Sequence, residues 1–159
     1  MVGKIESIVY QPLATDIAHG KFYRVPIDNV NLLAGHGIEG DRKAGRNPKR
    51  HLNIMMRETL DELADYGYKT GAGEMGEQLQ ISGIDIATMP EGTLLQIGES
   101  AVIRLNKPRT GCVWLEHVQD RPVNETIGKL GIMASVIESG HISIGDKISL
   151  LSVPELDPA

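Results

Sequence analysis

The chain contains a single cysteine, Cys112, and it follows the basic sequence Lys107-Pro108-Arg109-Thr110-Gly111. A thiolate is both a nucleophile and a soft metal ligand, and a nearby arginine or a helix N-terminus favours it over the thiol. Gly111 leaves room for a ligand to approach the backbone. The spacing therefore predicts a reactive or metal-binding thiol at Cys112. A buried, inert cysteine is the alternative interpretation.

A basic stretch lies between Gly35 and His51. It places five basic residues against two acidic ones, on a chain whose formal net charge is -5; the basic residues are Arg42, Lys43, Arg46, Lys49 and Arg50. A concentrated positive patch on an acidic protein indicates a local anionic ligand. A solvated surface loop is the alternative interpretation.

A glycine-rich acidic turn covers residues 71–76, and Glu77 follows it directly. The turn matches G-x-G-x-x-G, as does the stretch 35–40, but a dinucleotide loop needs a strand before it and a helix after it. Neither context is predicted here. Glu77 is a candidate ligand-binding residue, and closure of the turn onto backbone N–H groups is its alternative role.

Composition narrows the class of protein. The 159 residues are 41% hydrophobic and 23% charged, with 18 glycines and only 4% aromatic residues, which favours β structure with many tight turns. One cysteine excludes multi-cysteine zinc and iron–sulfur sites. The acidic charge argues against a nucleic-acid partner. No apolar run could span a membrane and no signal peptide is recognised at the N-terminus, so we expect a cytoplasmic protein with no membrane partner.

Short alternating segments separated by glycine turns predict a mainly β fold. We expect the strands to close into a barrel, because closure removes exposed edges. The apolar positions Met56, Leu60, Leu63 and Ala64 predict a helix that ends at Gly67. Two more short helices are expected over 114–119 and 124–130, and residues 152–159 form a short acidic tail after a single domain over 1–151. The predicted strands are 4–9, 52–55, 79–81, 93–97, 101–106, 134–137, 141–144 and 147–151.

Four stretches together resemble the MOSC family, the molybdenum cofactor sulfurase C-terminal domain. They are Gly37-Ile38-Glu39-Gly40-Asp41-Arg42-Lys43-Ala44-Gly45, Gly73-Glu74-Met75-Gly76-Glu77-Gln78-Leu79 with Gly83-Ile84-Asp85, Pro108-Arg109-Thr110-Gly111-Cys112, and Gly131-Ile132-Met133-Ala134-Ser135-Val136 with the turns through Gly145-Asp146. The stretches keep the family's order over roughly residues 1–150. Two positions depart from the usual pattern: Gln78 replaces an asparagine, and Gly111 replaces a frequent proline.

The resemblance implies a β-barrel, closed or partly open, related to the barrel domain of pyruvate kinase, with a few short helices. It also implies a molybdopterin-type molybdenum cofactor. Cys112 would then hold a persulfide or ligate molybdenum, while Arg42, Lys43 and Arg46 bind the cofactor phosphate and Asp41 orients Arg42. By the same resemblance, cofactor binding extends to Glu77, Arg109 and Thr110.

Three functions follow from the resemblance as hypotheses. The first is a cofactor-binding sulfur carrier or transferase for maturation of the molybdenum cofactor or of metal–sulfur clusters. No pyridoxal phosphate site is expected in this chain, so its partner would be a pyridoxal phosphate-dependent cysteine desulfurase or another sulfur donor, with a molybdoenzyme as acceptor. The second is a molybdenum-dependent reductase of N-hydroxylated compounds that takes electrons from a partner protein. The third is a non-catalytic barrel that binds another anion or a protein.

Overall fold

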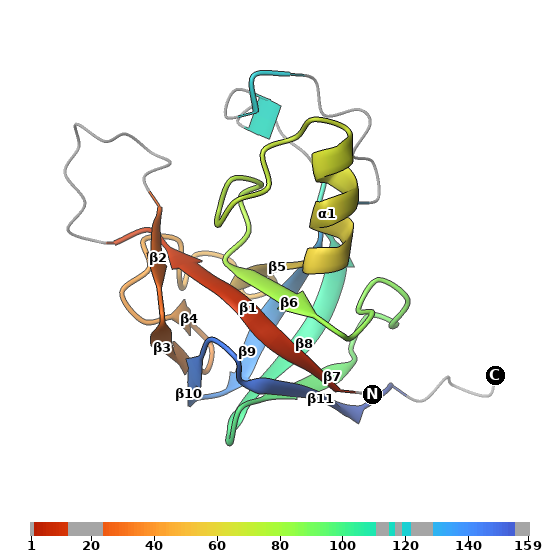
Figure 1. Cartoon of the computed structure of the whole chain (residues 1–159). Helices are drawn as coiled ribbons and strands as arrows, with labels where there is room; N and C mark the ends of the chain where they lie inside the picture. Colours follow the sequence, from red (N-terminus) through yellow and green to blue (C-terminus); the bar gives the residue numbers. More distant parts are fainter. Residues whose placement is uncertain (1, 13–23, 111–114, 117–118, 122–128, 155–159) are drawn as a thin grey trace.

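The computed structural model describes residues 2–12, 24–110, 115–116, 119–121 and 129–154. Seven strands close into a barrel (Figure 1), each hydrogen-bonded to the next and the last to the first. In order around the barrel they are β1 (Val2–Tyr10), β6 (Leu79–Ser82), β5 (Leu52–Met56), β9 (Ile132–Glu138), β8 (Ala101–Pro108), β7 (Leu94–Ile97) and β11 (Lys147–Ser152). An eighth strand, β2 (Val25–Ile27), pairs with the far end of β1.

Strand direction explains where the helix lies. Neighbouring barrel strands are antiparallel except for β5 and β6, which pair in parallel with Ile54 opposite Leu79. A parallel pair needs a crossover connection, and α1 (Arg57–Asp65) begins directly after β5 and supplies it. The helix and the loop that follows it therefore cover one end of the barrel, outside β5 and β6 (Figure 1).

Aliphatic side chains fill the barrel interior. Alternate residues of each strand point inward, as Leu52 and Ile54 of β5 do, and the interior is built from isoleucine, leucine, valine and alanine. A second group of buried side chains lies on the outside of β5, beneath α1. This outer cluster consists of Met55, Leu60, Leu63, Tyr68, Met75, Leu115 and Leu130.

A small second sheet flanks the barrel. It contains β10 (Gly140–Ser143), β3 (Asn29–Leu33) and β4 (Gly37–Ile38), in that order. The predicted strand 141–144 is β10, whereas β2, β3 and β4 were not among the predicted strands. These three are short, and their two asparagines, proline and glycine are residues typical of turns. Only Asn29–Leu32 alternates between polar and apolar residues, and that alternation is too short to distinguish a strand from a turn.

Most other predictions of secondary structure are confirmed where the structure describes them. Each predicted barrel strand is present, with ends that differ by a few residues, and the predicted helix is α1, followed by Gly67 at φ 92°. Of the predicted helix 114–119, residues 115, 116 and 119 are described and are helical, and the rest lies outside the described residues. Residues 124–128 of the other predicted helix also lie outside them, and 129–130 are not helical. The tail from 155 is likewise not described. No helix in the described part of the chain is long and apolar enough to cross a membrane.

Candidate functional site

The glycine-rich turn forms a tight loop that leads into β6. Gly73 and Gly76 have φ values of 78° and 84°, a conformation that residues with a side chain rarely adopt. The Glu77 carboxylate is fully buried beneath the loop and accepts hydrogen bonds from the backbone N–H groups of Gly73 (2.7 Å) and Met75 (3.1 Å). It also accepts one from Gln80 Nε2 (2.9 Å). Glu77 thus holds the loop in shape; its predicted contact with a ligand stays a prediction.

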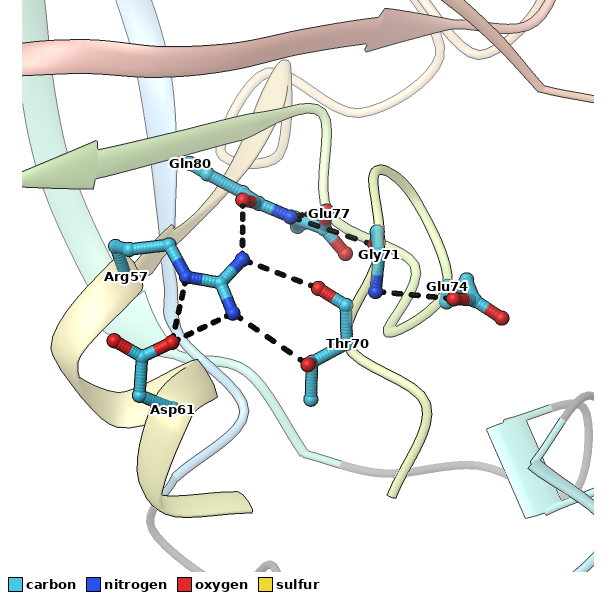
Figure 2. A network of polar contacts seen from close by, with 7 residues as sticks. All are labelled: Arg57, Asp61, Thr70, Gly71, Glu74, Glu77 and Gln80. Carbon is cyan, nitrogen blue, oxygen red and sulfur yellow. Dashed lines mark hydrogen bonds and ion pairs between the residues drawn. The ribbon is translucent and has the colours of Figure 1, made fainter. Parts of the chain in front are cut away.

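A polar network connects this loop to α1 (Figure 2). Arg57, the first residue of the helix, forms an ion pair with Asp61 (2.8 Å) and donates to the carbonyl of Thr70 (3.2 Å) and to Gln80 Oε1 (3.0 Å). Gln80 in turn donates to Glu77. The network therefore fixes both ends of the loop relative to α1, because Thr70 precedes the loop and Gln80 follows it.

Arg109 reaches the loop from the other side. It follows β8 directly, its backbone N–H donates to the carbonyl of Gly131 (2.9 Å), and its buried guanidinium donates to the carbonyl of Met75. The barrel order places β9 and β5 between β8 and β6. The Arg109 side chain therefore extends across the outer face of these two strands at the end of the barrel.

Four cations from three segments lie near one another beside this loop: Arg24, Lys43, Arg50 and Arg109, of which Arg24 and Arg109 border Gly73 and Gly76 directly. We call them the cationic cluster. Burial lowers the pKa of Lys43, and the positive charges of Arg24, Arg50 and Arg109 lower it further. Burial also lowers the pKa of Arg24, while the carboxylates of Asp41 and Glu77 oppose that shift. The four charges repel one another, and a bound anion would relieve that repulsion.

Arg24 and the neighbouring Asp41 each have a buried polar atom without a hydrogen-bond partner among the described residues. The atoms are Nη1 of Arg24 and Oδ2 of Asp41. The other carboxylate oxygen of Asp41 accepts from the backbone N–H of Gln11 (3.0 Å), which ties the basic loop to the end of β1. Buried polar atoms are almost always paired, so a free donor and a free acceptor here indicate a site built for a polar ligand.

The predicted site residues fall in different places. Asp41, Lys43 and Arg109 lie in or beside the cationic cluster, where Asp41 and Arg109 are buried and the Lys43 side chain remains exposed. Arg46 is exposed on the loop outside the cluster, and Thr110 is exposed after β8. Arg42 is half-buried, and its backbone N–H donates to the carbonyl of Gln11 (2.8 Å). Cys112 lies outside the described residues. No group of three metal-binding side chains occurs in the described ranges.

The MOSC domain family model matches residues 41–149, which is more than half of the chain. The chain belongs to the MOSC family. No curated protein matches it significantly. The match includes the basic loop, the glycine-rich loop, Arg109 and the segment with Cys112. MOSC domains are associated with the molybdenum cofactor, so family membership points to a function related to that cofactor.

Solved structures share the fold of this MOSC domain. YuaD from Bacillus subtilis is 21% identical with a TM-score of 0.76, over 93% of this chain and 94% of that protein. YiiM from Escherichia coli is 25% identical with a TM-score of 0.67, over 94% and 70% of the two chains. YiiM from Geobacillus stearothermophilus is 19% identical with a TM-score of 0.74, over 94% and 75%. Similar barrels thus occur in proteins of different lengths.

Two cations of the MOSC domain were missed as site residues. Arg24 lies directly before β2 and outside every motif found in the sequence, and the pairing of β2 with β1 brings it near Asp41. Arg50 belongs to the basic stretch, but nothing in the sequence indicates that Arg50 rather than Lys49 lies at the site. Its position just before β5 is the signal that could have distinguished it, because a strand fixes the residues at its ends.

Proposed function

We propose that this MOSC domain binds the molybdenum cofactor by its phosphate group and carries sulfur on Cys112. The observation that carries the first half of the proposal is the cationic cluster with its unpaired buried atoms, Arg24 Nη1 and Asp41 Oδ2. A phosphate accepts hydrogen bonds from guanidinium and ammonium groups and neutralises their mutual repulsion. The residues present therefore fit the phosphorylated end of the cofactor.

Each part of the site has a distinct role in this proposal. Arg24, Lys43 and Arg50 bind the phosphate, and Asp41 accepts from a donor of the cofactor. Arg109, fixed to the glycine-rich loop, adds positive charge between the phosphate and the segment that leads to Cys112. When bound, the cofactor supplies a metal centre able to accept sulfur or a thiolate ligand.

The sulfur step is a thiol exchange. The Cys112 thiolate attacks the outer sulfur of a persulfide on a donor protein, the donor's S–S bond breaks, and the donor leaves as a thiolate. Cys112 then holds the persulfide. The number of electrons is unchanged, so the step needs no external oxidant or reductant. A cysteine desulfurase is a donor of the right chemical class.

The phosphate half is tested with inorganic phosphate as the probe. Calorimetric titration of the cofactor-free protein should show phosphate binding that Arg24→Gln weakens about tenfold or more, the size expected for one charge-assisted hydrogen bond. Arg46→Gln is the matched control, because Arg46 is an arginine of the same basic loop that does not belong to the cationic cluster, and it should change the affinity less than twofold. Equal losses in both variants would contradict the proposed site.

The sulfur half is tested with the cofactor present. Protein purified from a host that makes the cofactor is analysed for molybdenum per chain, beside Cys112→Ala. Stoichiometric metal that disappears in the variant would identify Cys112 as a metal ligand and favour the reductase alternative. Persulfide on Cys112 after incubation with a cysteine desulfurase and cysteine is the result expected for a carrier. Neither metal nor persulfide would contradict both functions.

A further inference from the structure

Asn53 of β5 is buried without hydrogen bonds to its side chain. The residue is 2% exposed, and neither Nδ2 nor Oδ1 has a partner among the described residues. Its backbone, in contrast, is fully used: the N–H donates to Gln78 Oε1 (2.7 Å) and the carbonyl accepts from the Gln78 N–H (3.0 Å). Two unpaired polar atoms on one buried side chain are costly unless something else binds them.

The side chain of Asn53 lies on the outer face of the barrel. Leu52 and Ile54 point into the interior, so Asn53 and Met55 share the opposite face, and Met55 belongs to the outer cluster. On this face Asn53 lies between Met133 of β9, its partner in the strand register, and Gln78, which follows Glu77. Arg109 crosses the same outer face of β9 and β5 on its way from β8 to the carbonyl of Met75.

A second buried asparagine shows what a purely structural role requires. Asn106 of β8 is 7% exposed, and its Nδ2 donates to the carbonyl of Lys49 (2.7 Å) and to Ser135 Oγ (2.8 Å). It thereby anchors the basic loop to the barrel. Asn53 performs no such function in the described structure, although both asparagines lie on outer faces of nearby strands.

We infer that the Asn53 carboxamide is a ligand-binding group of the proposed site. A carboxamide presents one donor and one acceptor side by side, so it recognises a group with an adjacent acceptor and donor, as on the lactam edge of a pterin or another amide-containing heterocycle. The cationic cluster binds the anionic end of such a ligand, and the Asn53 carboxamide forms hydrogen bonds with the edge of its heterocyclic ring. The inference rests on the proposed function.

The test compares stability and binding in Asn53→Leu and Asn106→Leu. In urea unfolding of ligand-free protein, Asn53→Leu should keep or raise the midpoint, because it removes unpaired atoms at similar volume, whereas Asn106→Leu should lower it. In a fluorescence titration with pterin-6-carboxylate, Asn53→Leu should lose at least tenfold in affinity. Its affinity for inorganic phosphate should change less than twofold. Asn53→Ala repeats the binding measurements with a smaller side chain.

Three results would overturn the inference. A lowered urea midpoint in Asn53→Leu with unchanged pterin affinity would mean that the carboxamide binds only internal water. Binding of phosphate but not of the pterin by the wild type would reject the role of Asn53 while leaving the phosphate site intact. Absence of phosphate binding in the wild type would instead contradict the proposed function itself, and the inference with it.

Discussion

Gly76 and Arg109 share one space at the end of the barrel: a Cβ on Gly76 would lie 2.5 Å from Nη2 of Arg109. The guanidinium occupies the volume that any other residue at position 76 would fill. The glycine therefore does more than allow the turn, because it also lets Arg109 reach the carbonyl of Met75.

Gly76→Ala should displace Arg109 as well as strain the backbone. Positive φ alone costs a non-glycine residue on the order of 1 kcal/mol, and overpacking adds about 1–3 kcal/mol. Gly35→Ala is the matched control, since Gly35 has φ 72° and open space around its Cβ. We expect urea unfolding to show a larger decrease in the free energy of unfolding for Gly76→Ala than for Gly35→Ala. The excess should disappear when Arg109→Ala is added to both; if it persists, the shared space is not its cause.

Glu77→Gln should destabilise the glycine-rich loop. The amide would turn one acceptor into a donor, facing the N–H groups of Gly73 and Met75 and the Gln80 amide. A buried unpaired donor costs about 1–3 kcal/mol in the free energy of unfolding. The control is Glu74→Gln, because Glu74 is half-buried and its carboxylate accepts one bond, from the Gly71 N–H (3.0 Å). Equal effects in denaturant unfolding would contradict a special role for Glu77.

His51 should make the protein less stable as the pH falls. Its Nδ1 accepts a hydrogen bond from the backbone N–H of Val136 (2.9 Å), which requires a neutral ring. Burial lowers the pKa of His51, and the charges of His36 and Arg104 lower it further. The unfolded chain therefore binds a proton before the folded one does. Stability is complete above about pH 6.5, the ordinary histidine value, and is lost as the pH falls toward the lower folded pKa.

The variant His51→Asn checks this pH dependence. Asparagine Oδ1 can replace Nδ1 as the acceptor and does not titrate. We expect the decrease in unfolding free energy between pH 7 and pH 5 to be smaller in the variant than in the wild type. Identical pH profiles would show that other groups cause the decrease.

Anion binding should depend on the protonation of Lys43. Its pKa is lowered by burial and by three neighbouring arginines, and a bound anion reverses part of that shift. Anion affinity should therefore decrease as the pH rises through a value below the ordinary lysine pKa, with proton uptake on binding. Sulfate is the suitable probe because it does not titrate in this range. Lys43→Met should bind sulfate more weakly and independently of pH, as measured by calorimetry in two buffers.

The sequence predicted the barrel because its strands alternate regularly and are separated by glycine turns. It did not predict β2 or β3, and so it could not bring Arg24 to Asp41. Asn53 was missed for a similar reason. Asn53 is a polar residue inside the apolar run Leu52–Met56, and the sequence alone does not indicate a function for it. Only the structure shows that its side chain is buried with two unpaired polar atoms. Motifs located the loops of the site, whereas long-range strand pairing determined which side chains meet there.

The pairing of Val2 with Ser149 makes β11 the strand that completes the barrel. On a ribosome, β1 is made before all the other strands of the barrel, and its last partner, β11, is made after all of them. Contacts this distant in sequence slow folding. During synthesis the edge of β1 that later receives β11 is open to pairing with other nascent chains until β11 has been made.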